Sequence, residues 1–404
     1  MSPVLGDQDG GARTAASAPL PSRLHSAAVN LAALGFGLLV ALLLLELLLR
    51  VHNPFQARVK GNRIVLLTNT QYQIKNDVIP SLDPVVTVSR NSLGFRGANP
   101  PPDLSSKLSM VAIGGSTTQC FFLSDDKTWP ARLGLHLGNA FRDVWMNNAG
   151  LDGHSTFGHI ALLEDQVVKL HPKAVLFLVG ANDVARDPNE EWDAENVKSR
   201  ISFRSPTSLM KTLSPYSEVA ALLSNLFRSF NAYKRGLMHQ KIDLKALPLI
   251  DIPAGEVEAY MAQNASPVHI KGFEMRLRRL LADCKSAGIE PILITQPLLA
   301  GEGIDDVTHK DLARVETSPR HTGKMYWDLL EKYNDVTREL GKESGVQVAD
   351  VARELPKSSR YFYDFIHYTN DGAERIAAII YNQVCPTLAA RFPGHVQAAC
   401  AHLD

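Results

Sequence analysis

The stretch that most constrains this chain is Met110 to Gln119, which reads Met-Val-Ala-Ile-Gly-Gly-Ser-Thr-Thr-Gln. A short apolar run ends in two glycines and a serine, and this predicts a buried strand, a tight turn and the start of a helix. Ser116 at such a turn would lie near a helix N-terminus, where free backbone N–H groups favour developing negative charge. A nucleophilic serine needs such a setting.

Two other interpretations of this turn remain open at this point. Ser116 can simply cap the helix that follows it. The two glycines can also belong to a loop that cradles a phosphate, but no Gly-Lys-Ser/Thr follows them, which argues against a Walker-type site.

Composition narrows the class of protein. The chain has 404 residues, of which 45% are hydrophobic and 21% charged, and these values are typical of a globular protein with a sizeable core. Lys+Arg and Asp+Glu both number 42, so no global charge points to a nucleic-acid partner. The four cysteines match no zinc pattern. Cys385 and Cys400 can pair in an oxidising compartment, and Cys120 is expected to be a small core residue.

The N-terminal region predicts a membrane anchor. Residues 1–26 are rich in Gly, Ala, Ser and Pro and are expected to form a flexible tail. Residues 27–49 are apolar except for Asn30 and Glu46, and as a helix they would rise about 34 Å, enough to cross a bilayer. A cleaved signal peptide is the alternative, but the run is long and no Ala-x-Ala-like site follows it before residues 50–54. Glu46 would reach the headgroups from the end of the span.

The charges that flank residues 27–49 bear on the orientation of this anchor. Two basic residues precede the span and four follow it closely: Arg13 and Arg23, then Arg50, Arg58, Lys60 and Arg63. Counted literally, the positive-inside rule slightly favours a cytoplasmic C-terminal domain. The positively charged N-terminal amine narrows the difference in positive charge between the two sides of the span.

The rest of the chain divides into an extended preface and a larger domain. Residues 50–105 hold β-rich pieces at 64–67 and 85–88 and end in a proline run. Residues 106–390 alternate apolar strands with amphipathic helices, whereas 391–404 are expected to form a tail. The expected strands are 108–113, 144–148, 174–179, 291–295 and 346–349, and the expected helices are 128–138, 156–170, 268–287, 323–343 and 370–384. This alternation predicts an α/β fold with a parallel sheet covered on both faces, with its site at the carboxyl ends of the strands.

The strand–helix pattern is interrupted at about residues 187–265. This segment is polar at first and then contains helical runs around 206–235. A long insertion after the carboxyl end of a strand is well placed to cover a site or to shape a substrate. A peripheral helical appendage or a surface for a partner is the alternative.

Three later stretches also follow predicted strands or precede the last helix: 147–155, 180–183 and 363–372. Asp364 and His367 lie three residues apart, so the carboxylate can hold the imidazole in one tautomer and make it a general base for a hydroxyl group. Asn370 or Asp371 can cap the helix behind them. Taken singly, each of these signals is more typical of a turn.

Taken together, the four blocks resemble the SGNH hydrolase family, the GDSL-like esterases and lipases, in a membrane-anchored bacterial form. The blocks are Gly114-Gly115-Ser116-Thr117-Thr118, Asn148-Ala149-Gly150-Leu151-Asp152-Gly153, Gly180-Ala181-Asn182-Asp183 and Asp364-Phe365-Ile366-His367. The resemblance covers about residues 108–386 and implies a flavodoxin-like, doubly wound parallel sheet. The first block departs from Gly-Asp-Ser-Leu, and the insertion exceeds that of minimal members.

The resemblance also implies a role for each block. Ser116 would be the nucleophile, His367 the general base and Asp364 the residue that orients His367. The oxyanion hole would consist of the N–H groups of Ser116 and Gly153 and the side-chain amide of Asn182. Gly153 is preferred to Gly150 because the family's glycine falls several residues after the opening asparagine.

The function expected from this resemblance is hydrolysis of an O-acyl ester, such as an O-acetyl group on an envelope glycan or a lipid, through an acyl-serine. No metal or organic cofactor is needed. An O-acyltransferase would use the same residues, and an anchored binding module would show broken blocks, whereas every position here is filled. The resemblance places the catalytic domain in the periplasm or outside the cell, against the charge count.

Overall fold

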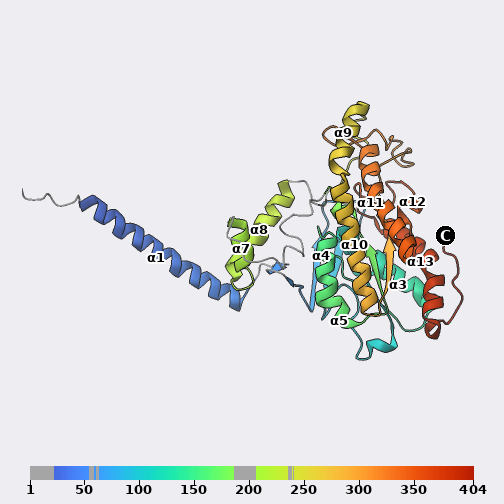
Figure 1. Cartoon of the computed structure of the whole chain (residues 1–404), viewed down its shortest axis with the longest axis horizontal. Coiled ribbons are helices and arrows are strands. Elements are labelled where there is room, and N and C mark those ends of the chain that lie inside the picture. The colour runs from blue at the N-terminus through green and yellow to red at the C-terminus, as the bar shows by residue number, and fades with distance from the viewer. Residues whose placement is uncertain (1–21, 54–58, 61–62, 186–205, 235–238, 240) are drawn as a thin grey trace, which may run out of the picture.

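The computed structural model describes residues 22–53, 59–60, 63–185, 206–234, 239 and 241–404 (Figure 1). Residues 1–21 of the predicted tail lie outside the described residues, whereas residues 22–26, also expected in the tail, already belong to a helix. Helix α1 (Ser22–Val51) projects away from the rest of the chain. Within the described residues, it is the one helix long and apolar enough to cross a membrane.

A five-stranded parallel sheet forms the centre of the larger domain. Its strands lie in the order β11-β8-β7-β5-β6, with bounds β5 (Leu108–Gly114), β6 (Val144–Asn148), β7 (Ala174–Leu178), β8 (Glu290–Ile294) and β11 (Gln347–Ala349). If the five strands are numbered 1 to 5 in chain order and the sheet is read from the β6 edge, the strand order is 2-1-3-4-5. This is the strand order of a flavodoxin-like sheet. The predicted fold class is confirmed. The strand order reverses at β5, and such a switch point opens a crevice at the carboxyl ends of the strands.

Helices cover both faces of this sheet and bury two separate cores. Met110 and Ala112 of β5 face the core that includes α3 and α13, whereas Val111 and Ile113 face the core that includes α4, α10 and α11. The alternation follows from the two-residue period of a strand. The helix bounds are α3 (Trp129–Ala140), α4 (Thr156–Leu162), α5 (Val168–Leu170), α10 (Pro267–Ser286), α11 (Gly323–Ser344), α12 (Val351–Glu354) and α13 (Asn370–Arg391).

Helix α13 and the residues after it differ from expectation. The helix was expected to end at 384, before Pro386, but it continues to Arg391 because the fully buried Leu388 packs into the core. The segment 391–404 is bound to the domain and is not a free tail. Cys385 and Cys400 form a disulfide, and the Gln397 N–H donates to the Ala140 carbonyl at 2.9 Å.

The preface folds as small antiparallel pairs. β3 (Thr70–Lys75) pairs with β4 (Val85–Arg90), and β1 (Val59–Lys60) pairs with β2 (Arg63–Ile64). The expected strand at 64–67 is wrong beyond Ile64, since Leu66 leaves the strand to pack against Gly94. β3 was missed because its polar, largely exposed side chains carry no apolar alternation.

Arg96 ties the preface to the loop that follows Ser116. Its guanidinium is buried and donates to the Asp125 carboxylate at 2.7 Å. It also donates to the carbonyl oxygens of Gln119, Cys120 and Leu123 at 2.6, 2.9 and 2.6 Å. One side chain therefore fixes the course of residues 119–125.

The described parts of the insertion form separate pieces. α7 (Pro206–Leu213) and α8 (Glu218–Lys234) occupy the predicted helical region, and α8 contacts the end of α1 (Figure 1). α9 (Ala254–Asn264) contacts α11. Two short strands, β9 (Glu316–Ser318) and β10 (His321–Thr322), come directly before α11 in the chain. The polar start of the insertion lies outside the described residues.

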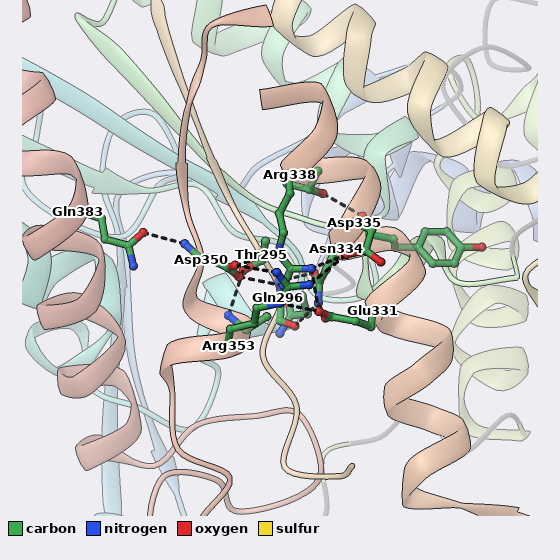
Figure 2. Close-up of polar contacts among 12 residues, drawn as sticks. Thr295, Gln296, Glu331, Asn334, Asp335, Arg338, Asp350, Arg353 and Gln383 are labelled. Atoms are coloured by element: carbon green, nitrogen blue, oxygen red, sulfur yellow. Dashed lines mark hydrogen bonds and ion pairs between the residues drawn. The ribbon is translucent and has the colours of Figure 1, made fainter. Parts of the chain in front are cut away.

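A charged network fixes α11 to the carboxyl ends of β8 and β11 (Figure 2). Arg338 donates to both carboxylate oxygens of Asp350, at 2.8 and 2.9 Å, and pairs with Glu331 at 2.7 Å. Burial alone would raise the pKa of Asp350, but hydrogen bonds from Arg338 and Thr295 lower it below its usual value. Asn334, on the same helix, accepts from the Gln296 N–H at 2.8 Å.

We expect Arg96→Met to lower the free energy of unfolding by about 3–5 kcal/mol, because a carboxylate and three carbonyls lose their donor. Urea unfolding of the detergent-purified protein measures this. Arg142→Met, which removes an exposed arginine bound to the Gly394 carbonyl, should cost less than about 1 kcal/mol. Equal losses for the two variants would contradict the role given to Arg96.

Candidate active site

The turn that contains Ser116 joins β5 to a very short helix. Ser116 begins α2 (Ser116–Gln119), which ends at Cys120 in a left-handed conformation with φ 52°. The sequence predicted a helix start here, but a single turn carries few aligned peptide dipoles. The dipole of α2 at Ser116 is therefore weak.

Both glycines of the turn are required by close contacts. A Cβ on Gly114 would lie 2.1 Å from Thr118 Oγ1 and 2.6 Å from the Leu178 carbonyl oxygen. A Cβ on Gly115 would lie 2.4 Å from Asn182 Nδ2. The third block of the sequence thus packs directly against the residue before Ser116.

Ser116, His367 and Asp364 form one chain of hydrogen bonds. Ser116 Oγ lies 2.8 Å from His367 Nε2, and His367 Nδ1 lies 2.6 Å from Asp364 Oδ2. The other oxygen of Asp364 accepts from the backbone N–H groups of Ile366 and His367 at 2.8 and 2.7 Å. Since a carboxylate only accepts, Nδ1 carries the proton and Nε2 is free to accept from the serine.

The turn that holds His367 is fixed from both ends. The Tyr363 N–H donates to the His367 carbonyl at 3.0 Å. The residue that caps α13 is Thr369, whose Oγ1 accepts from the Gly372 N–H at 3.1 Å. The expected caps, Asn370 and Asp371, already lie inside the helix, because Thr369 has the extended backbone conformation that a cap needs.

The loop after β6 is anchored to the turn that contains Ser116. Its Leu151 N–H donates to the Gly114 carbonyl at 3.0 Å. The two glycines of this loop differ: a Cβ on Gly150 would lie 2.3 Å from the Gln119 nitrogen, whereas Gly153 has φ +71° and open space around it. Gly150 is therefore a packing residue, whereas no described atom other than those of its chain neighbours lies within 4 Å of the Cβ position of Gly153.

Asn182 lies beside this loop and precedes a residue that forms a buried ion pair. Its side-chain amide donates to the His154 carbonyl at 3.0 Å. The adjacent Asp183 is fully buried and accepts from the hydroxyl and N–H of Thr156 and from Arg276, the last at 3.2 Å. Asp183 was quoted in the sequence only as part of a block, and nothing marked Arg276 as its partner.

His239 of the insertion lies against His367, and the sequence analysis did not find it. The two ring centroids are 4.2 Å apart. His239 Nδ1 lies 2.9 Å from the Tyr363 hydroxyl, and Nε2 lies 3.6 Å from Asp152 Oδ1. Phe121 stacks on the ring with a centroid distance of 5.6 Å. A lone histidine in an irregular stretch gives no sequence signal for this position.

His239, Asp364 and His367 place possible metal-ligand atoms within 4.8 Å of one another. Asp364 and both ring nitrogens of His367 already take part in the hydrogen-bond chain with Ser116. A cation could bind here only by breaking that chain. The cluster is therefore better described as a serine–histidine–aspartate arrangement with a second imidazole beside it.

Cys120 lies beneath the serine. It is buried, and burial raises the pKa of its thiol to about 12. Such a thiol remains protonated at neutral pH and is a poor nucleophile. The expectation of a small core residue agrees with this setting.

Gln296 connects the neighbours of the serine and the histidine. Its Oε1 accepts from the Thr117 hydroxyl at 3.0 Å, and its Nε2 donates to the Tyr368 hydroxyl at 2.9 Å. Asn334 fixes its backbone through the network of Figure 2. Gln296 thus joins the residue after Ser116 to the residue after His367.

We expect Gln296→Leu to lower the free energy of unfolding by about 1–3 kcal/mol, because a buried hydroxyl loses its partner. Tyr368→Phe removes one of the hydroxyls that Gln296 contacts, so the two losses should not add in the double variant. Chemical denaturation of the three variants measures the coupling. Strict additivity would mean that Gln296 and Tyr368 act independently.

Comparison with known proteins identifies the family. Residues 112–375 match the model of the GDSL-like Lipase/Acylhydrolase family. No curated protein matches the chain.

Several solved structures align over much of the chain at low identity. An acetylxylan esterase, Axe2, from Geobacillus stearothermophilus is 14% identical with a TM-score of 0.38, over 68% of this chain and 93% of that one. The acetyl xylan esterase AlAXEase is also 14% identical with a TM-score of 0.38, over 68% of this chain and 99% of that one. A putative lipolytic protein of the G-D-S-L family from Desulfitobacterium hafniense is 14% identical with a TM-score of 0.35, over 67% of this chain and 96% of that one.

The family model spans well over half of the 404 residues and contains the serine, the asparagine and the Asp-x-x-His turn. The chain belongs to the GDSL-like lipase/acylhydrolase family and is a carboxylic ester hydrolase.

Proposed function

We propose that the enzyme hydrolyses O-acyl esters through an acyl-serine formed on Ser116. The observation that carries this proposal is the hydrogen-bond chain from Ser116 through His367 to Asp364. His367 Nε2 takes the hydroxyl proton while Ser116 Oγ bonds to the ester carbonyl carbon. The tetrahedral intermediate then expels the alcohol, which receives that proton from His367.

Water then hydrolyses the acyl-serine, and His367 again acts first as the base and then as the acid. His367 takes a proton from water as the water oxygen attacks the acyl carbon, and Ser116 leaves with the proton returned to Oγ. The proposed oxyanion donors are the N–H groups of Ser116 and Gly153 and the amide of Asn182. The contact of Asn182 with Gly115 and the open space at Gly153 support this assignment.

We assign the substrate as a short O-acyl ester, such as an O-acetyl group on an envelope glycan. Thr117, Cys120, Leu123, Tyr363 and Tyr368 pack closely around Ser116 and His367. The small space that these residues enclose supports an acetyl group as the acyl part rather than a fatty acyl chain. Lipid esters, also considered from the sequence, would need these side chains to move.

We further propose that α1 is an uncleaved anchor and that the catalytic domain lies outside the cytoplasm. The length and composition of α1 support the anchor. The disulfide between Cys385 and Cys400 supports an oxidising compartment. This argument outweighs the small difference in flanking positive charge.

O-acyl transfer is the second candidate function. The observation that favours it is the position of His239, whose ring lies against His367 and comes from the insertion. A group that covers the general base restricts the approach of water, and restricted water favours an alcohol acceptor. Product analysis with and without an acetyl-accepting glycan separates the two reactions.

Ser116→Ala is expected to lower kcat on p-nitrophenyl acetate by at least about a thousandfold, because the nucleophile is lost. Rates on the parent protein should fall steeply as the acyl chain lengthens from acetyl to palmitoyl. Labelling by a fluorophosphonate should be confined to Ser116. Full turnover by a correctly folded Ser116→Ala protein would refute the proposed nucleophile.

Asp364→Asn is expected to lower kcat by about 10⁴-fold, because an amide can donate to Nδ1 and thereby favour the wrong tautomer of His367. The control is Asp371→Asn, which changes an exposed carboxylate in the first turn of α13, seven residues after Asp364. This variant should keep kcat within about twofold of the parent value. Equal rates for the two variants would remove Asp364 from the proposed triad.

The proposed location makes a prediction for the cysteines. Chains taken from cells and denatured without reductant should react with maleimide at Cys120 and Cys284, which are free thiols in the structure, and at all four cysteines after reduction. An impermeant amine reagent should label the domain once the outer envelope is opened. Four reactive thiols before reduction would place the domain in a reducing compartment.

A further inference from the structure

The partly buried carboxylate of Glu46 connects the last turns of α1 to the start of α8. Glu46 accepts from the Ser217 hydroxyl at 2.8 Å and from the N–H groups of Glu218 and Val219 at 3.1 Å each. Arg50 donates to Glu46 at 2.8 Å and to the Tyr216 carbonyl at 2.6 Å. Glu46 therefore caps the N-terminus of a helix that lies about 170 residues further along the chain.

This contact fixes the position of α8 along the axis of α1, the proposed anchor. Glu46 precedes the end of α1 at Val51 by five residues, a rise of about 7.5 Å along the helix axis. If α1 crosses a bilayer, that depth corresponds to the border between the hydrocarbon core and the headgroups. Figure 1 shows α7 and α8 beside this end of α1.

Several large apolar side chains of α7 and α8 are exposed to solvent. On α8, Leu223, Leu226, Phe227 and Phe230 recur at helical spacing and are 44–54% exposed. On α7 and the turn that follows it, Leu209, Leu213 and Tyr216 are also exposed. The face of α8 that packs inward contains instead the small side chains of Ala220 and Ala221.

We propose that α7 and α8 lie on the surface of the bilayer that α1 spans, with this exposed stripe inserted at the headgroup boundary. The inference rests on the anchor proposed above and adds a second contact with the same membrane. Amphipathic helices bind bilayers in this way, with the apolar face buried about 5–10 Å. Attachment at two points would fix the orientation of the catalytic domain over the membrane, which a single helix alone would not do.

The test uses the full chain in phosphatidylcholine vesicles and a tryptophan placed on the stripe. Phe227→Trp should emit at shorter wavelength than an exposed tryptophan, and lipids brominated near the headgroup boundary should lower its emission about twofold after subtraction of the parent signal. Leu135→Trp, at a 57% exposed position on α3, is the matched control and should not be quenched.

A second variant tests whether the stripe itself makes the contact. Adding Leu226→Glu to Phe227→Trp places a charge in the proposed buried face and should return quenching to the control value. Adding Leu135→Glu instead should leave the quenching of Phe227→Trp unchanged. Circular dichroism of both variants establishes that the helices remain folded.

The outcomes separate this inference from the proposal on which it rests. If alkaline carbonate releases the parent chain from membranes, the anchor fails. If the chain is retained but Phe227→Trp is quenched no more than Leu135→Trp, the bilayer contact of α8 is refuted. A short-wavelength emission that brominated lipid does not quench would indicate a protein partner or a second copy on this face, and would also overturn the proposal.

Discussion

The site depends on one constraint: the loop that follows β7 comes very close to the turn that follows β5. Gly114 and Gly115 leave no room for a Cβ, so the backbone of this turn can touch Leu178 and Asn182. This contact is available because β5 and β7 are neighbours in the sheet, at the point where the strand order reverses. The serine, the asparagine and the loop after β6 consequently lie at one edge.

Around that turn, polar side chains from separate elements hold the segments of Ser116, Asn182 and His367 in place. Arg96 fixes the loop after the serine, Gln296 joins the neighbours of Ser116 and His367, and Asp183 fixes the loop of Asn182. Each is buried and each makes several hydrogen bonds. Such support would give the proposed triad the fixed geometry, within about 0.5 Å, that catalytic groups need.

The insertion serves two distant parts of the molecule. Its first described helices bind the end of α1 through Glu46, while His239 lies against His367 and Tyr363. A lid over the site was one expectation for this insertion, and a peripheral appendage was the other. The described residues contain an element of each, because a long insertion can contact surfaces that a short loop could not reach.

The alternation of strands and helices in the sequence predicted the α/β class, because it depends on local pattern, and the family resemblance implied the flavodoxin-like sheet that the structure contains. The spacing of the four blocks brought out the residues from Ser116 to His367, whose catalytic roles stay predictions. The sequence could not give Arg96, Gln296, Arg276 or His239 their positions, because their partners lie far away in the chain. It also placed the cap of α13 one or two residues late, because the backbone geometry at Thr369 decides where the helix begins. It ended that helix too early, at 384, because the packing of Leu388 in the core lies outside the local pattern. Tertiary structure decides which polar groups are buried together, and burial determines how strongly they are held.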